Sequence, residues 1–170
     1  MFGAAMQNHT GRIRRLNEMA LFSDDFVIRP LTREDAPVLA VLESRCVGAA
    51  KWGEPALRDV GAKGIVGWAS SRGNVVVGFI LVRAVADEME IMNLAVDPDA
   101  RRQGIAARLL AHAIEEVRRA DVKRVYLEVR ESNSGARTFY SSGGFTEQGR
   151  RRNYYSQPAE DALLLVLRLH

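Results

Sequence analysis

The sequence has 170 residues, 47% hydrophobic and 26% charged, with a formal net charge of +3 and a pI near 9.3. These values are typical of one folded globular domain and argue against wholesale disorder, and the positive charge is too small for a dedicated nucleic-acid-binding protein. The single cysteine, Cys46, excludes an internal disulfide, and three scattered histidines give no zinc-site pattern. We therefore expect a protein without a metal, located in a reducing cytoplasm.

The sequence predicts neither a membrane span nor a signal peptide. No stretch approaches the roughly eighteen consecutive apolar residues that a span requires. Residues 1–25 lack the order of a charged and then an apolar region that a signal peptide has. We interpret residues 1–25 as a flexible N-terminal extension and residues 26–170 as the folded domain.

Hydrophobic patterning predicts the secondary structure along the chain. Strand-like runs either alternate between apolar and polar residues or are apolar throughout, whereas helix-like runs repeat apolar residues every three or four positions. The predicted strands are residues 26–31, 65–70, 75–85, 88–96, 124–130 and 162–169, and the predicted helices are 32–46, a short one within 53–63, 101–119 and 133–142.

Local signals refine these elements. Thr32 is the expected N-cap of the first helix, whose apolar face contains Ala36, Leu39, Val41 and Leu42. An "SRGN" sequence indicates a hairpin between the second and third strands, and the fourth strand is apolar on both faces in its second half, as a central strand is. The order of elements predicts an α/β (α+β) single domain with a mixed central sheet of six to seven strands flanked by about four helices.

The segment "DPDARRQGIA" (residues 97–106) combines features of an anion-binding turn. Its proline ends the fourth strand, because proline cannot donate to a sheet ladder. The first amides of the helix that follows have no intrahelical partner and carry the positive end of the helix dipole. Gly104 would let a phosphate approach this backbone, and Arg101 and Arg102 add forked donors. This is the chemistry of a pyrophosphate cradle.

A second interpretation of the same turn stays open, namely a basic, solvated start of a helix with a turn glycine. The turn lacks the Gly-Lys-Ser/Thr triplet of a P-loop and the three spaced glycines of a dinucleotide-binding fold, which excludes those two classes of site. Taken alone, it favours the solvated helix start.

Two longer segments carry more information than the turn alone. "NLAVDPDARRQGIAARLL" and "VYLEVRESNSGARTFYSSGGF" resemble the Gcn5-related N-acetyltransferase (GNAT) superfamily, in which Arg/Gln-x-x-Gly-x-Gly/Ala lies between a central strand and a long helix and binds the pyrophosphate of acetyl-CoA. With "GRRRNYY" and "EDALLL", the chain resembles the RimI-like branch, which acetylates the N-terminal alanine of a small-subunit ribosomal protein. The resemblance covers roughly residues 26–169.

The resemblance implies a set of cofactor-binding residues. The end of the fourth strand would offer backbone groups to the pantetheine arm and the acetyl carbonyl, the turn would hold the pyrophosphate, and Asn133 would contact the cofactor while capping its helix. By resemblance, the residues that bind acetyl-CoA are Leu94, Ala95, Val96, Arg101, Arg102, Gln103, Gly104, Ile105, Ala106, Ala107, Asn133 and Tyr140.

Glu128 lies in a strand that points Tyr126 and Glu128 to one face and apolar residues to the other. A buried and unpaired glutamate is costly, so we expect this side chain to face a wet cleft. The resemblance assigns Glu128 as the catalytic proton acceptor from the amine, acting directly or through water. The alternative is a solvated strand charge that pairs with Arg130.

Tyr140 lies near the end of the helix that Asn133 is expected to cap. By resemblance it is the catalytic proton donor to the departing coenzyme A thiolate, and a phenol with a pKa of about 10 stays protonated until then. The alternative is that Tyr140 packs beside Phe139 with its hydroxyl at the surface.

Three aromatic residues, Trp52, Tyr154 and Tyr155, are the candidates for the acceptor side of the site. Tyrosine supplies contact area and a hydrogen bond at low entropic cost. The alternative for residues 150–156 is an exposed turn that covers the sheet. Trp52 follows Lys51, where RimI-like chains usually have proline, and this departure bears on the choice of amine.

The sequence therefore predicts direct acetyl transfer from acetyl-CoA to the α-amino group of a protein, with a ribosomal protein as the leading acceptor. One rival is N-acetylation of a small-molecule amine, such as a polyamine or an antibiotic. Another is a non-catalytic acyl-CoA-binding or ribosome-associated module, although mere binding would not require Glu128 and Tyr140. We expect no direct nucleic-acid or membrane partner, and a monomer or weak dimer.

Overall fold

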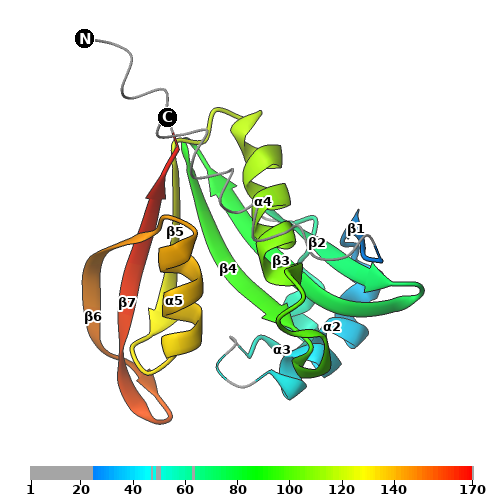
Figure 1. Ribbon diagram of the computed structural model, residues 1–170, viewed down its shortest axis with the longest axis horizontal. Helices are drawn as coiled ribbons and strands as arrows, with labels where there is room; N and C mark the ends of the chain where they lie inside the picture. Colours follow the sequence, from blue (N-terminus) through cyan, green and yellow to red (C-terminus); the bar gives the residue numbers. More distant parts are fainter. Residues whose placement is uncertain (1–24, 47, 49–50, 63, 170) are drawn as a thin grey trace.

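The computed structural model describes residues 25–46, 48, 51–62 and 64–169. Their strands form one seven-stranded sheet in the order β1-β2-β3-β4-β5-β7-β6, with helices on both faces (Figure 1). The strands are Val27–Pro30 (β1), Ile65–Arg72 (β2), Val75–Val85 (β3), Glu88–Val96 (β4), Arg124–Arg130 (β5), Thr146–Ser156 (β6) and Ala159–Arg168 (β7). The prediction for the N-terminal extension lies outside the described residues, except at Asp25.

Four α-helices and two short 3-10 turns complete the described part of the chain. None of these helices is long and apolar enough to cross a membrane. The helices are Ala36–Arg45 (α2), Gly53–Leu57 (α3), Ile105–Arg118 (α4) and Ser134–Ser142 (α5), and the 3-10 turns are Arg33–Asp35 (η1) and Pro98–Ala100 (η2). The predicted single α/β domain with a mixed sheet is confirmed.

The sheet is antiparallel except at its centre. β1 to β4 pair antiparallel in chain order, and β7 pairs antiparallel with both β5 and β6. The one parallel contact joins β4 to β5, on either side of the crossover through α4. The predicted hairpin between β2 and β3 and the central place of β4 are both confirmed.

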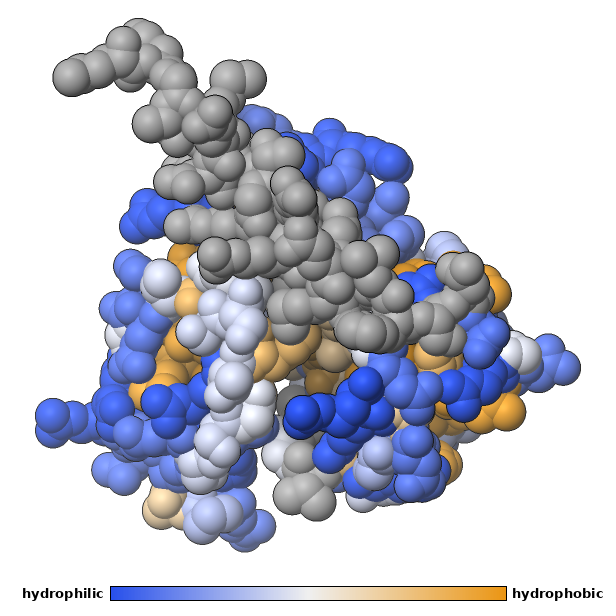
Figure 2. Space-filling model, in the orientation of Figure 1, coloured by the Kyte–Doolittle hydropathy of each residue, from blue (hydrophilic) through white to orange (hydrophobic). Residues whose placement is uncertain are grey.

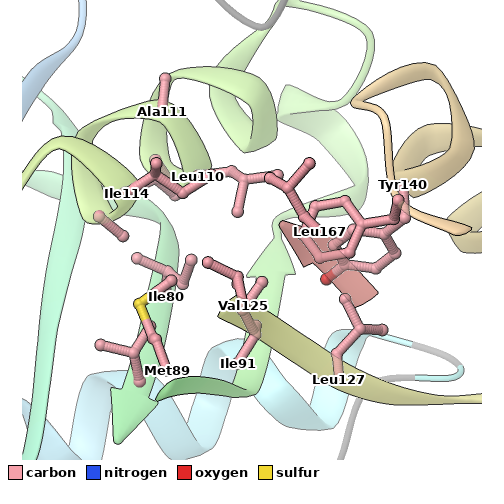
Figure 3. Close-up of a cluster of buried hydrophobic side chains, with 14 of the residues drawn as sticks. Ile80, Met89, Ile91, Leu110, Ala111, Ile114, Val125, Leu127, Tyr140 and Leu167 are labelled. Carbon is pink, nitrogen blue, oxygen red and sulfur yellow. The ribbon is translucent and has the colours of Figure 1, made fainter. Parts of the chain in front are cut away.

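Each face of the sheet has its own hydrophobic core. On one face, Leu110 and Ile114 of α4 point toward Ile80, Met89 and Val125 of the sheet (Figure 3). On the other face, α2 and α3 cover a smaller cluster of Leu39, Leu42, Leu57, Phe79 and Leu81. Each fully buried side chain of this size contributes about 1.5–3 kcal/mol, so the sheet is held rigidly from both sides.

The helix predicted to begin at residue 101 begins at Ile105. Arg102 and Gly104 have φ angles of 62° and 75°. A left-handed residue cannot continue a right-handed helix, so the segment up to Gly104 forms a turn that leads into α4. This difference matters because it leaves the arginines of the motif in a loop.

Two details of the first helix also differ from the prediction. Val41 is 62% exposed, because two positions from the buried Leu39 correspond to about 200° around a helix. Thr32 is the N-cap of the 3-10 turn η1, whereas α2 itself begins at Ala36 with Asp35 as its N-cap. The Asp35 carboxylate accepts from the Thr32 backbone N–H at 2.8 Å.

Residues 150–156, for which an exposed turn was the alternative, form part of the edge strand β6. β6 pairs with β7 and is exposed along most of its length. The pairing is interrupted between Arg151 and Tyr155, where Asn153 has a φ of 50°. A polar, bulged edge strand resists pairing with other chains, and here it carries Tyr154 and Tyr155 beside β7.

Candidate active site

β4 and β5 diverge at the centre of the sheet. They are joined by three successive pairs, Glu88 with Arg124, Met89 with Val125 and Glu90 with Tyr126. No further pair joins these two strands, whose residues are all described. Beyond Glu90, β5 therefore no longer supplies ladder partners to β4. Figure 2 shows a hollow on this face, between α5 and the start of α4.

Leu94, Ala95 and Val96 lie along this opening. Leu94 and Val96 pack against the larger core, and Ala95 is buried in the smaller one. The Val96 carbonyl accepts from Arg101 Nε at 3.2 Å and from Cys46 Sγ at 3.3 Å. The structure thus brings all three residues to the opening, with the Val96 carbonyl already engaged by other parts of the chain.

The first turn of α4 contains backbone N–H groups that the helix itself leaves without an acceptor. Gly104 is the N-cap of α4 and has no side chain with which to cap the helix. The N–H groups of the first turn, from Ile105 to Ala107, therefore lack both an intrahelical acceptor and a cap from this residue. Arg101 and Arg102 are exposed beside them, which makes the turn a site for an anion.

Side chains from two other elements hold this turn in place. Arg45, at the end of α2, contacts Asp97 at 2.6 Å and Asp99 at 2.8 Å. Arg72, at the end of β2, donates to the Gln103 side chain at 2.5 Å. The turn is therefore fixed before any ligand binds, and both carboxylates near it are paired with Arg45.

Glu128 projects from β5 as the alternation predicts, because Val125, Leu127 and Val129 of the same strand are buried in the core on the other side. Its side chain is 19% exposed, and Arg151 Nε lies 2.8 Å from its Oε1. The hydroxyl of Tyr154 lies beside the Glu128 carboxylate, which raises the pKa of Tyr154.

The alternative partner of Glu128, Arg130, is wrong. Arg130 contacts Glu160 at 3.2 Å, and its guanidinium lies 3.9 Å from the ring centre of Tyr155. The neighbouring strands provide these partners, whereas Arg130 lies two positions along β5 from Glu128, roughly 6.6 Å at the usual rise per residue.

Tyr140 is buried at the edge of the larger core (Figure 3). Its ring contacts Phe139 and Phe145 at centroid distances of 5.0 and 5.2 Å. The predicted packing against Phe139 is confirmed, but the side chain is buried, which contradicts the alternative of a hydroxyl at the surface. Burial raises the pKa of the Tyr140 hydroxyl well above its usual value, so it stays protonated.

Asn133 caps α5, since its Oδ1 accepts from the Ala136 N–H at 3.1 Å. It also lies beside Gly48, because a Cβ on Gly48 would lie 2.9 Å from Asn133 Nδ2. The cap is as predicted, and the structure adds that Gly48 lies at the start of α5.

Glu43 is a residue of the site region that sequence reasoning missed. It is 2% exposed and lies on α2. Its carboxylate accepts from the backbone N–H groups of Trp52 and Gly53 at 3.1 Å and from Asn93 Nδ2 at 2.6 Å. The sequence did contain a signal for its burial: Glu43 follows Leu39 by four residues, so both side chains lie on the buried side of α2. Glu43 thereby fixes the position of Trp52 relative to β4.

Lys51, which replaces the usual proline before Trp52, stabilises the same region. Its Nζ donates to the backbone carbonyls of Glu43 and Cys46, which lie at the C-terminal end of α2. Carbonyls at a helix end lack intrahelical donors, and a cation there also complements the helix dipole. Trp52 itself is half-buried against the smaller core, so the structure places it beside α2 and β4.

Replacing Glu43 by alanine is expected to destabilise the protein by about 3 kcal/mol, because two backbone N–H groups and an amide would lose their acceptor. Glutamine keeps one acceptor oxygen and should cost less. Burial raises the pKa of Glu43 in the folded protein. At a pH between the pKa of the unfolded state and that of the folded state, the folded protein therefore binds more protons. The contribution of Glu43 to stability should therefore fall as the pH rises through its folded pKa.

Urea unfolding of the wild type and of Glu43→Gln across pH 4 to 8 tests this pH dependence. The difference in free energy of unfolding should shift in favour of glutamine as the pH rises above about 4.5. A difference that is constant with pH would contradict the assignment of Glu43 as a buried titrating group.

Comparison with known proteins identifies the family. The chain matches the model of the Acetyltransferase (GNAT) family over residues 23–145. It is 34% identical over 142 residues to the ribosomal protein bS18-alanine N-acetyltransferase of Escherichia coli (strain K12), and the match covers 82% of this chain and 95% of that protein. The chain belongs to the GNAT acetyltransferase family.

Solved structures of this family agree with the fold. The crystal structure of the ribosomal-protein-S18-alanine N-acetyltransferase from Escherichia coli superposes with a TM-score of 0.77 at 33% identity, covering 85% of this chain and 94% of that one. Arabidopsis thaliana NAA60 in complex with acetyl-CoA gives a TM-score of 0.76 at 21% identity, covering 85% and 98%. The second likeness concerns the fold alone.

As a GNAT member, the chain is an acetyl-CoA-dependent N-acetyltransferase. This confirms the predicted enzyme class and co-substrate, and the non-catalytic module is not favoured. Within the described residues, no group of three or more His, Cys, Asp or Glu side chains is placed to hold a metal ion.

Proposed function

We propose that this enzyme acetylates the N-terminal α-amino group of a protein, namely the N-terminal alanine of the small-subunit ribosomal protein bS18. The support is a match over 95% of the length of a relative with that named activity. The observation that carries the proposal is the opening between β4 and β5, with an anion-binding turn at one end and Glu128 beside it. Donor and acceptor would bind together, as a ternary complex requires.

The fit to acetyl-CoA rests on the turn and on the edge of β4 from which β5 has diverged. The left-handed Gly104 and the exposed Arg101 and Arg102 suit a pyrophosphate, and the open edge of β4 suits an amide-bearing arm. When bound, acetyl-CoA supplies an acetyl group activated as a thioester. The proposed contacts are Leu94, Ala95, Val96, Arg101, Arg102, Gln103, Gly104, Ile105, Ala106, Ala107, Asn133 and Tyr140.

Glu128 and Tyr140 are the proposed catalytic pair. Tyr140 packs with the side of β5 that carries Leu127, whereas Glu128 projects from the other side. The pair therefore reaches the opening from opposite faces of the sheet. Glu128 would take a proton from the acceptor ammonium, directly or through water, so that the free amine attacks the thioester carbonyl. The Tyr140 hydroxyl would donate its proton to the coenzyme A sulfur as the carbon–sulfur bond breaks.

The α-amino group suits this base better than a lysine does. A carboxylate is a weak base, and an α-amine has a pKa of about 8 against about 10.4 for lysine. Less energy is therefore needed to obtain the free amine. The exposed Tyr154, in edge-to-face contact with Tyr155 at 5.1 Å, lies beside Glu128, and these two residues with Trp52 are the proposed contacts to the acceptor peptide.

Replacing Gly104 by alanine is expected to raise the KM for acetyl-CoA about tenfold. The φ of 75° costs an alanine about 1 kcal/mol, and the added Cβ would stand where the phosphate approaches. Gly61→Ala is the matched control, because Gly61 has a φ of 85° and no atom within 4 Å of an added Cβ. Equal effects of the two substitutions on KM would argue against the cradle.

A panel of peptides tests the acceptor. The enzyme is incubated with acetyl-CoA and the N-terminal peptide of bS18, variants with other first residues, and a copy whose α-amine is blocked but which keeps a lysine. We expect acetylation, read by intact mass, at free N-termini with small first residues and none on the blocked peptide. Acetylation of polyamines with no reaction on any peptide would establish the small-molecule rival instead.

A ribosomal acceptor would place the enzyme in the cytoplasm, in agreement with the expectation from its single cysteine. The expectation of a monomer or weak dimer stays a prediction, which light scattering of the purified protein would test.

A further inference from the structure

The carboxylate of Glu128 is already paired with a cation from the protein itself. Arg151, on the edge strand β6, places its Nε 2.8 Å from Glu128 Oε1. The Arg151 side chain is 62% exposed, whereas that of Glu128 is 19% exposed. The cation therefore covers the carboxylate from the solvent side, which is the side from which an acceptor would arrive.

Tyr154 completes this arrangement. Its hydroxyl lies beside the Glu128 carboxylate, which raises the pKa of that hydroxyl, and the Arg151 guanidinium lies 5.4 Å from the centre of the Tyr154 ring. Arg151, Tyr154 and Glu128 thus form one contact set, which we call the Glu128 triad. In this set the Arg151 cation occupies the position beside the Glu128 carboxylate that the ammonium of an acceptor would need.

The chemistry of arginine limits what Arg151 can do in this position. The guanidinium of arginine stays protonated in proteins. Arg151 can therefore neither be acetylated as a free amine nor give its proton to Glu128. It can only hold the place of another cation. An ion pair with one largely exposed partner is weak, so an incoming ammonium can displace it.

The edge strand gives Arg151 room to move. The pairing of β6 with β7 is interrupted immediately after Arg151, and Asn153 in the interruption has a left-handed backbone. β6 is the last strand of the sheet, and its outer side has no neighbouring strand in the described residues. The side chain can therefore swing toward solvent without breaking a ladder.

We propose that Arg151 occupies the acceptor-amine subsite of the free enzyme and so determines specificity: Glu128 becomes available only to a cationic amine that displaces Arg151. This inference rests on the proposed role of Glu128. An α-ammonium of a peptide N-terminus can compete for the carboxylate, whereas an uncharged acceptor cannot. The ion pair between Arg151 and Glu128 therefore raises the KM for the acceptor and leaves the rate of the chemical step unchanged.

The test compares Arg151→Gln, Arg151→Lys and Arg152→Gln in the full-length enzyme. Arg152 is the next residue on the exposed strand, so its replacement removes the same charge beside the triad. Binding of the bS18 N-terminal peptide to the enzyme–coenzyme A complex is measured by calorimetry, together with kcat and KM. Thermal unfolding of each variant verifies that the fold is retained.

We expect Arg151→Gln to lower the peptide Kd and KM about two- to fivefold, the size expected for a partly exposed ion pair, with kcat within about twofold of the wild type. Arg151→Lys should restore the wild-type values, and Arg152→Gln should leave them unchanged. An unchanged or weaker Kd in Arg151→Gln would overturn the proposal, since Arg151 would then be inert or would itself bind the peptide.

Failure of the proposed function would look different. In that case the wild type would neither bind nor acetylate the peptide. Spermidine then serves as the probe cation for the same three variants. The same order of Kd values would support displacement of Arg151 by a cation, and the reverse order would overturn it.

Discussion

Replacing Glu128 by glutamine is expected to lower kcat about a hundredfold or more, the usual effect of losing a general base. Glutamine keeps the shape of the side chain and a hydrogen-bond acceptor for Arg151 and Tyr154, but it cannot take a proton from the amine. The KM for acetyl-CoA should stay near its wild-type value, because the turn at Gly104 is unaffected. Initial rates of coenzyme A release, with products verified by intact mass, measure the change.

Glu131→Gln is the matched control for this substitution. Glu131 directly follows the same strand, is partly exposed and pairs with Arg150 at 2.8 Å. Its replacement removes the same charge without reaching the opening between β4 and β5, so kcat should change less than about twofold. If Glu128→Gln behaves like this control, another group or bulk water accepts the proton.

Replacing Tyr140 by phenylalanine is expected to lower kcat by a similar factor of about a hundred. The aromatic contacts with Phe139 and Phe145 depend on the ring and should survive, so the melting temperature should change little. A loss of rate without a loss of stability would assign the effect to the hydroxyl. Tyr126→Phe, on β5, is the control, and it should retain nearly full kcat.

The pH dependence adds a second test of Tyr140. Burial raises the pKa of its hydroxyl above the ordinary value of about 10. The hydroxyl therefore carries its proton throughout the range from about pH 6 to 9, and the ratio of wild-type to Tyr140→Phe rates should be constant there. A ratio that falls toward pH 9 would mean that the group ionises within the assay range, contrary to its burial.

The opening between β4 and β5 explains why these two residues can act on one reaction. The strands share three pairs at one end and then separate. Glu128 and Tyr140 lie on opposite sides of β5, so a group between the strands could contact both. The fixed turn at Gly104 supplies a third point of attachment, and positioning of this kind lowers the entropic cost of the reaction.

Local sequence determined the elements and much of the candidate site. The alternation in β5 places Glu128 opposite the core, the Asn133 cap and the glycines after Ser142 bound α5, and "SRGN" forms the hairpin. These features depend on residues close together in the chain, whose steric and hydrogen-bonding preferences act over a few positions. For the same reason, the glycine-bearing turn before α4 was recognisable from its residues alone.

Only the tertiary structure decided which partners these residues have. Glu128 pairs with Arg151, 23 positions further along the chain. The strand order β5-β7-β6 brings β6 close enough to β5 for the two side chains to meet across β7. Glu43 is buried because Asn93 and the start of α3 fold against it, and Val41 is exposed because only one side of α2 faces the sheet. Contacts between distant segments follow from packing and strand order, and no pattern of neighbouring residues contains that information.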